Sequence, residues 1–100
     1  MQAYKIKLTD RFQQELHDIL GFIAESSPSN ALHFRNELYT QIARLNFMPF
    51  RCRKHFANAD SAGDNIRDLI FKGYVVVFLV DKMALNVEIL GIYKANKWKI

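Results

Sequence analysis

Five residues in the second half of the chain have side chains that could together cleave RNA. Attack of a 2′-hydroxyl on its phosphate needs a base for that hydroxyl, cations for the crowded phosphate and an acid for the leaving oxygen. Arg53 and Lys54 could supply positive charge, and Arg67 could bind a phosphate through two hydrogen bonds. His55 or Tyr93 could transfer the protons. The alternative makes Arg67 a structural ion-pair partner and Tyr93 a packing residue, and the sequence leaves both interpretations open.

Other catalytic chemistries find little support in the residue pattern. Cys52 and His55 have the spacing of half a zinc motif, but no second pair accompanies them, and His17 and His33 lie far away along the chain. A nucleophilic pair of Cys52 and His55 is equally disfavoured. The four glycines are scattered, so they form no phosphate-binding loop. We therefore expect neither a metal nor a cofactor.

The positive charge of the chain is concentrated in its second half. The formal net charge is +4, and residues 1–50 carry five basic and five acidic groups, so the whole excess lies in residues 51–100. It gathers in the segment RCRKH at 51–55 and at Lys94, Lys97 and Lys99. Such clusters favour a polyanion or an acidic protein as the partner, although solvated surface explains a single cluster about as well.

These clusters and the aromatic side chains beside them are the candidates for contact with a target. Trp98 and Tyr93 could stack on a base or fill a partner's pocket, or Trp98 could fold back over the edge of the sheet. The complete set of target-binding candidates is Arg51, Arg53, Lys54, Arg67, Lys72, Tyr93, Lys94, Lys97 and Trp98.

The length and composition indicate one globular domain over residues 1–100. Half of the residues are hydrophobic and 24% are charged, which is ordinary for a folded soluble domain. The single Cys52 excludes an internal disulfide framework. No apolar run has the length of a signal peptide or of a membrane span, so we expect a cytosolic protein without membrane contact.

The first half of the chain has the patterns of one strand and two helices. Residues 4–8 (YKIKL) alternate apolar and basic side chains, which predicts a half-buried strand. Asp10 is expected to cap the following helix, with Gln13 completing a capping box. Apolar side chains then recur at helical spacing. Ser27 is expected to cap a second amphipathic helix, with Pro28 at its first position, that ends near residue 46.

The second half is expected to contain a loop and three strands. Residues 50–64 show no period, which indicates a loop. The strands are expected over residues 66–71, 74–80 and 85–93. Lys72 and Gly73 suit a two-residue hairpin turn between the first two of these strands. The stretch 74–80 is apolar on both faces, which predicts a central position in the sheet.

The order of elements predicts an α+β fold of the type β-α-α-β-β-β. Two antiparallel helices, joined by about three residues, must cover one face of a mostly antiparallel four-stranded sheet, because their apolar stripes have nothing else to bury against. In the last strand, Val87 and Ile89 are expected on one face and Ile92 on the other. The basic clusters are expected to form one cationic rim that an acidic partner masks. Phe22 and Tyr39 lie off the centres of the apolar stripes and are candidate exposed contacts.

Several motifs occur in a fixed order along almost the whole chain. They are the opening strand and helix, SNALHFRNEL at 29–38 followed by a proline, RDL at 67–69, GYVVVF at 73–78 and VEILGIY at 87–93. Together they resemble the RelE/ParE superfamily of toxins from bacterial type II toxin–antitoxin modules. The resemblance implies a cytosolic growth inhibitor that a cognate acidic antitoxin holds silent. Phe22 and Tyr39, from their position off the apolar stripes, and Arg67 are the candidate antitoxin contacts.

The resemblance implies one of two activities on the same scaffold. RelE-like members cut mRNA in the ribosomal decoding site with basic residues and often a C-terminal Tyr or His, whereas ParE-like members lack that set and poison DNA gyrase. The family usually places an Arg after the Tyr of the central strand, but here Val75 follows Tyr74. The preceding strand lacks the paired lysines of the RelE subgroup and carries Asp68. These departures favour ParE-like action on a protein target such as gyrase. Ribosome-dependent mRNA cleavage and an inert nucleic-acid-binding remnant remain the alternatives.

Overall fold

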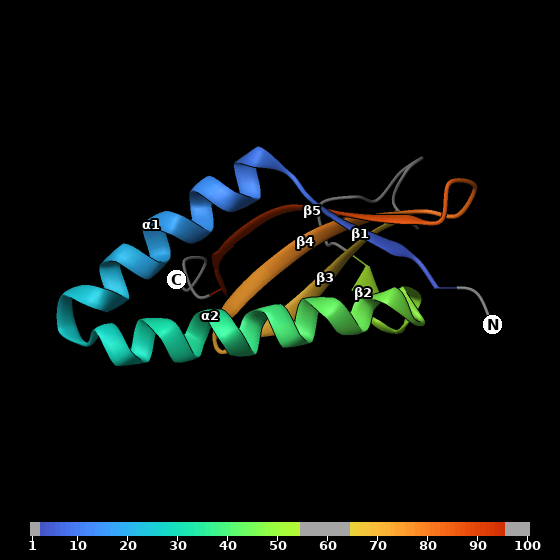
Figure 1. Cartoon of the computed structure of the whole chain (residues 1–100). Helices are drawn as coiled ribbons and strands as arrows, with labels where there is room; N and C mark the ends of the chain where they lie inside the picture. Colours follow the sequence, from blue (N-terminus) through green and yellow to red (C-terminus); the bar gives the residue numbers. More distant parts are fainter. Residues whose placement is uncertain (1–2, 55–64, 96–100) are drawn as a thin grey trace.

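A helical hairpin covers one face of a mostly antiparallel sheet, as the order of elements predicts (Figure 1). The computed structural model describes residues 3–54 and 65–95. Its elements are β1 (Lys5–Leu8), α1 (Asp10–Ser26), α2 (Pro28–Ala43), the 3₁₀ turns η1 (Arg44–Asn46) and η2 (Pro49–Arg51), β2 (Arg53–Lys54), β3 (Ile66–Phe71), β4 (Tyr74–Asp81) and β5 (Asn86–Lys94). None of the helices in these ranges is long and apolar enough to cross a bilayer.

The sheet has the strand order β1-β5-β4-β3-β2. β1 runs parallel to β5, and the other three pairings are antiparallel. The four expected strands are all present, and the apolar β4 lies in the middle of the order. The two-residue β2 comes from the segment expected to be a loop, and it pairs Arg53 with Asp68 and Lys54 with Arg67. A strand this short has no alternating pattern for a sequence to display.

The first helix begins one residue earlier than its capping signals predict. Thr9, not Asp10, is the N-cap, and its hydroxyl accepts a hydrogen bond from the Phe12 amide at 3.2 Å. The same hydroxyl donates to the Ile89 carbonyl at 2.6 Å, so a contact with β5 fixes the cap. The Gln13 side chain donates to the Leu8 carbonyl instead of completing a capping box. At the second helix, the prediction that Ser27 is the cap with Pro28 in the first turn is confirmed, and Ser27 alone joins the helices.

The core lies between the helical hairpin and the sheet. Its fully buried members come from both layers and include Phe12, Leu38, Phe78 and Ile89. Phe34 of α2 packs edge-on against Phe71 and Tyr74, with ring centroids 5.2 and 5.4 Å apart respectively. These contacts fasten α2 to the end of the hairpin formed by β3 and β4. That hairpin turns at Lys72 and Gly73 with φ of 47° and 83°, which confirms the predicted two-residue turn.

A bulge in β5 reverses the predicted orientation of Ile92. Val77 pairs with Gly91 and Phe78 with Ile89, which leaves Leu90 as an extra residue. The extra residue shifts the alternation of side chains by one position. Ile92 consequently joins Val87 and Ile89 in the core, so its assignment to the opposite face was wrong.

Glu15 of α1 closes the edge of β5 beyond the end of β1. Its Oε1 atom accepts a hydrogen bond from the Ile92 amide at 2.9 Å, and its Oε2 atom lies 3.1 Å from Nε of Arg11. A Cβ atom at Gly91 would approach Glu15 Oε1 to 2.7 Å, so a glycine at this position leaves room for the carboxylate. A helix side chain therefore takes the place of a neighbouring strand at this point.

We expect Glu15→Ala to destabilise the fold by about 1–2 kcal/mol, because the Ile92 amide loses a charged acceptor. Hydrogen exchange at the Ile92 amide should accelerate more than exchange in the middle of β4. Glu25→Ala in the exposed last turn of the same helix is the matched control and should change stability by less than about 0.5 kcal/mol. An unchanged exchange rate at Ile92 would contradict the assigned role of Glu15.

Candidate functional site

The face of the sheet opposite the helices, called the far face below, carries several of the candidate residues. Leu69, Val76 and Phe78 point into the core, so the residues that alternate with them point the other way. The far face therefore contains Asp68, Val75 and Val77, together with their cross-strand neighbours Arg53 and Tyr93. The sheet thus brings together two of the five catalytic candidates, Arg53 and Tyr93.

A buried carboxylate occupies the centre of this group. The Asp68 side chain has no exposed surface, whereas the Arg53 side chain is 60% exposed, and their Oδ2 and Nη2 atoms lie 3.5 Å apart. An ion pair with one buried partner is costly to form unless other contacts support the carboxylate. Arg53 is therefore engaged with the protein's own carboxylate, which competes with any phosphate for its positive charge.

Tyr93 lies in the same electrostatic environment. Burial raises the pKa of its hydroxyl, the Asp68 carboxylate raises it further, and Arg53 acts in the opposite direction. The hydroxyl consequently stays protonated at neutral pH, when it could donate a proton but would be a poor base. The two histidines in the described ranges, His17 and His33, belong to α1 and α2 on the other side of the sheet.

Arg67 has a different position from its neighbour Asp68. It lies on the helix side of β3, where one terminal nitrogen donates to the carbonyls of Phe50 and Cys52 at 3.3 and 2.9 Å. Its guanidinium carbon also lies 4.8 Å from the centre of the Phe50 ring, which Lys82 approaches to 5.3 Å. Arg67 therefore holds the segment that contains η2 against the sheet. These partners are backbone carbonyls, whereas the alternative named from the sequence was an ion pair.

Two further lysine candidates lie at the other end of β4, beside the turn from β3. Lys72 forms an ion pair with Glu37 of α2 and lies 5.7 Å from the Phe71 ring. Lys72 holds the pKa of Glu37 below its usual value, mainly through this hydrogen bond. Lys94 pairs with Tyr74 in the sheet, and its ammonium lies 5.7 Å from the Tyr74 ring.

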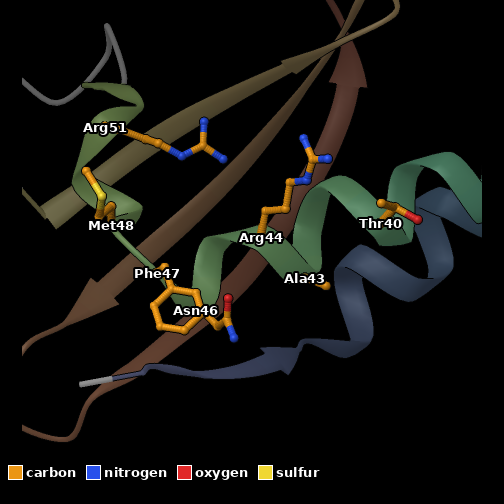
Figure 2. A pocket seen from close by; sticks show the side chains of 7 residues that line it. All are labelled: Thr40, Ala43, Arg44, Asn46, Phe47, Met48 and Arg51. Carbon is orange, nitrogen blue, oxygen red and sulfur yellow. The ribbon is translucent and has the colours of Figure 1, made fainter. Parts of the chain in front are cut away.

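Arg51 lines an open pocket at the bend after α2, which we call the elbow pocket. Its lining residues are Thr40, Ala43, Arg44, Asn46, Phe47, Met48 and Arg51, and its volume is about 640 Å³. Figure 2 shows Arg44 and Arg51 extending to the same side, from the end of α2 and from η2. Of the seven, only Arg51 was a sequence candidate. The available signal for the others was the apolar pair Phe47 and Met48 between two arginines.

The described cations do not form the single rim that the sequence suggested. Arg53 lies on the far face, Arg51 at the elbow pocket, and Lys72 and Lys94 beside the turn between β3 and β4. The expectation of one rim is therefore wrong for these residues, because strand alternation and the bend at η2 separate basic groups that are close in sequence.

The candidate partner contacts on the helices differ in exposure. Phe22 is 67% exposed, as expected. Tyr39 is only partly exposed, since it packs against the core while Arg35 lies 4.9 Å from its ring. Leu32, which the sequence analysis did not single out, is 55% exposed on α2.

Several candidates fall outside the described residues. His55, Lys97 and Trp98 belong to them, and of Lys54 only the backbone is described. Within residues 3–54 and 65–95, no three His, Cys, Asp or Glu side chains come together as a possible metal site.

The sequence model of one protein family matches almost the whole chain. It is described as ParE toxin of the type II toxin–antitoxin system, parDE, and it matches residues 6–97. The chain belongs to the ParE toxin family. No curated protein matches the chain in a sequence search.

Solved structures show that the fold of this ParE-family toxin extends beyond ParE. A chain from the chromosomal ParDE toxin–antitoxin system of P. aeruginosa superposes with a TM-score of 0.72 and 17% identity, covering 92% of this chain and 96% of that chain. A chain of the RelBE toxin–antitoxin complex of Mycobacterium tuberculosis superposes with a TM-score of 0.65 and 16% identity, covering 94% of this chain and 93% of that chain. A mutant of toxin RelE from E. coli in the free state also superposes with a TM-score of 0.65 and 16% identity, covering 97% of this chain and 88% of that chain. Because ParE and RelE chains share this fold, the activity must be argued from the site.

Proposed function

We propose that this toxin stops bacterial growth by binding a protein target, DNA gyrase, and not by cutting RNA. The observation that carries the proposal is the far face, where a buried carboxylate and valines stand where RNA chemistry needs cations. Val75, at the position where the superfamily usually has an Arg, is 2% exposed, and Asp68 is equally buried. A phosphate approaching this face would meet a negative charge already paired with Arg53.

Among the described residues, the proton-transfer candidate Tyr93 supports the same proposal. Cleavage through a 2′-hydroxyl needs a group that takes up a proton near neutral pH. Tyr93 has a raised pKa, so it does not serve as that base. Arg67, the other candidate for phosphate binding, donates to the carbonyls of Phe50 and Cys52. In the proposed mechanism, Arg67 is therefore a positioning residue that orients the segment of Arg51 and Arg53.

The remaining cations are the proposed contacts with the target. Arg51 is exposed at the elbow pocket, and Lys72 and Lys94 are exposed beside the turn between β3 and β4, so the proposal assigns them to two separate contact areas. Lys97 and Trp98 follow Lys94 closely in sequence, and we propose that they also contact the target. Positive charge on such surfaces accelerates encounter with an acidic partner and makes the rate sensitive to salt.

We also infer that an acidic antitoxin neutralises the toxin. The chain carries a net charge of +4 and exposes Phe22 and Leu32 on the helical hairpin, so an acidic amphipathic segment would find both charge and apolar surface to cover. Two of the similar structures come from toxin–antitoxin systems, which supports a partner of this kind. Binding would stabilise the toxin by mass action.

A supercoiling assay tests the proposed target. Purified toxin should block the supercoiling of relaxed plasmid by purified gyrase, and preincubation with its antitoxin should restore it. Relaxation of supercoiled plasmid by topoisomerase I is the control for binding or damage of the DNA by the toxin. The toxin should not change the rate of this relaxation. Full supercoiling at a large excess of toxin would eliminate gyrase as the target.

The same protein, added to translating ribosomes, distinguishes the RelE-like alternative. Toeprinting should reveal no codon-linked cuts in the mRNA. Cuts that disappear in an Arg53→Ala, Lys54→Ala double variant would instead establish ribosome-dependent cleavage and reject the proposal.

A further inference from the structure

The elbow pocket combines two arginines with exposed apolar side chains. Arg44 begins η1 at the end of α2, and Arg51 ends η2, so the bend between these turns brings the two guanidinium groups to one pocket (Figure 2). Thr40 and Asn46 are polar members of its lining, and none of its lining residues in the described part of the chain is a carboxylate. Across the residues that the structure describes, neither Arg44 nor Arg51 forms an ion pair. The pocket therefore offers two positive charges to a ligand.

The large apolar side chains of the pocket, Phe47 and Met48, are exposed to solvent, and the backbone of Met48 is strained. Phe47 is 46% exposed and Met48 is 65% exposed. Met48 adopts a left-handed backbone conformation, with φ of 51° and ψ of 52°, which is unfavourable for a residue with a Cβ atom. Backbone strain that leaves a large apolar side chain outside the core is typical of a surface that a partner covers.

We propose that the elbow pocket docks an acidic and apolar segment of the antitoxin. In this arrangement, a carboxylate of the antitoxin binds between Arg44 and Arg51, and an adjacent apolar side chain covers Phe47 and Met48. Arginine and carboxylate form short, charge-assisted hydrogen bonds with defined geometry. The inference rests on the proposed function in one respect, namely that the toxin has an acidic antitoxin.

The lining residues favour this occupant over two others. A nucleic acid gains affinity from many phosphate contacts, whereas this pocket has two cations beside a surface of Ala43, Phe47 and Met48. A second copy of the chain, related by two-fold symmetry, would bring four arginines together, and their repulsion would oppose association. An acidic peptide with an apolar neighbour is complementary to both parts of the pocket.

Calorimetric titration of the full-length toxin with the purified protein encoded by the neighbouring reading frame tests the inference. The Arg44→Glu, Arg51→Glu variant should raise Kd by about 100-fold, because two charge-assisted contacts become repulsive. Phe47→Ser with Met48→Ser should raise Kd by about tenfold by removing the apolar half. Circular dichroism melting of each variant verifies that it remains folded.

Lys5→Glu with Lys7→Glu is the matched control for the change in net charge. Both lysines are exposed on β1 and lie outside the pocket lining. At 0.15 M salt, where the Debye length is about 8 Å, this control should change Kd by less than about threefold. A scan of Asp or Glu→Lys substitutions in the partner should find one that restores binding to the Arg44→Glu, Arg51→Glu variant.

The outcomes separate the docking inference from the proposed function. If the neighbouring protein does not bind the wild-type toxin, the proposed antitoxin fails and the docking inference falls with it. If the wild type binds and the arginine variant binds with an unchanged Kd, only the docking inference is overturned. The inference is also overturned if the variant keeps its antitoxin affinity but loses salt-dependent binding to RNA or DNA, which would assign the pocket to nucleic acid.

Discussion

Replacement of Phe78 by alanine should destabilise the protein by about 3–5 kcal/mol, because it leaves a cavity in the middle of the core. Phe78 lies on the central strand β4, has no exposed surface and pairs with Ile89 beside the bulge in β5. A typical small domain has a total stability of about 5–15 kcal/mol, so this single change should leave a large unfolded fraction. Urea denaturation followed by circular dichroism measures the loss as a lower midpoint.

Phe22→Ala provides the matched control for this prediction. It removes the same side chain from α1, where Phe22 is 67% exposed, and should change stability by less than about 0.5 kcal/mol. Equal midpoints for the Phe78→Ala and Phe22→Ala proteins would show that the assigned core is incorrect. Because Phe22 is also a proposed antitoxin contact, this variant should lose affinity for the antitoxin while keeping its stability.

The second large effect is expected at Arg67. Arg67→Ala should cost about 2–4 kcal/mol, since the carbonyls of Phe50 and Cys52 lose a charged donor and the Phe50 ring loses one of its two cations. The loss should be local to the segment around η2. Hydrogen exchange at the amides of Arg51 and Cys52, which donate to carbonyls within this segment, should accelerate with it.

The thiol of Cys52 gives a chemical measure of the same change. Burial raises its pKa, against the opposing effect of Arg51 and Arg67, so alkylation of the wild type should be slow at pH 8. Exposure of the segment in Arg67→Ala should accelerate alkylation. Arg35→Ala is the control, because Arg35 is exposed on α2 and its guanidinium lies against the Tyr39 ring. Equal alkylation rates in the wild type and Arg67→Ala would show that Arg67 does not hold this segment.

Periodicity located most of the secondary structure because each long element repeats its apolar side chains. The strand over Tyr74–Asp81 is apolar on both faces, and that property by itself indicates a central strand. Ser27 with Pro28 marks the start of α2 through local chemistry that needs no tertiary contact. The turn at Lys72 and Gly73 is likewise determined by local residue types, because a two-residue turn needs residues that accept a positive φ.

Features fixed by contacts between distant residues could not be predicted in the same way. Thr9 caps α1 because β5 holds its hydroxyl, although Asp10 has the better sequence signal. The bulge at Leu90 turns Ile92 into the core, and an extra residue in a ladder leaves no mark on one sequence read alone. β2 exists because β3 pairs with it.

The sequence by itself determined the order of the elements, the α+β class, the resemblance to RelE/ParE toxins and the departure from the nuclease pattern at Val75. These properties follow from the types of residues and their spacing, which are local. Only the tertiary structure decided where each basic side chain lies and what it contacts. Arg53 lies beside buried Asp68, and Arg67 donates hydrogen bonds to the carbonyls of Phe50 and Cys52. Arg51 and Arg44 both line the elbow pocket. The physical reason is that side-chain partners depend on strand register and on the direction of a bend, and both are set by packing between segments far apart in the chain.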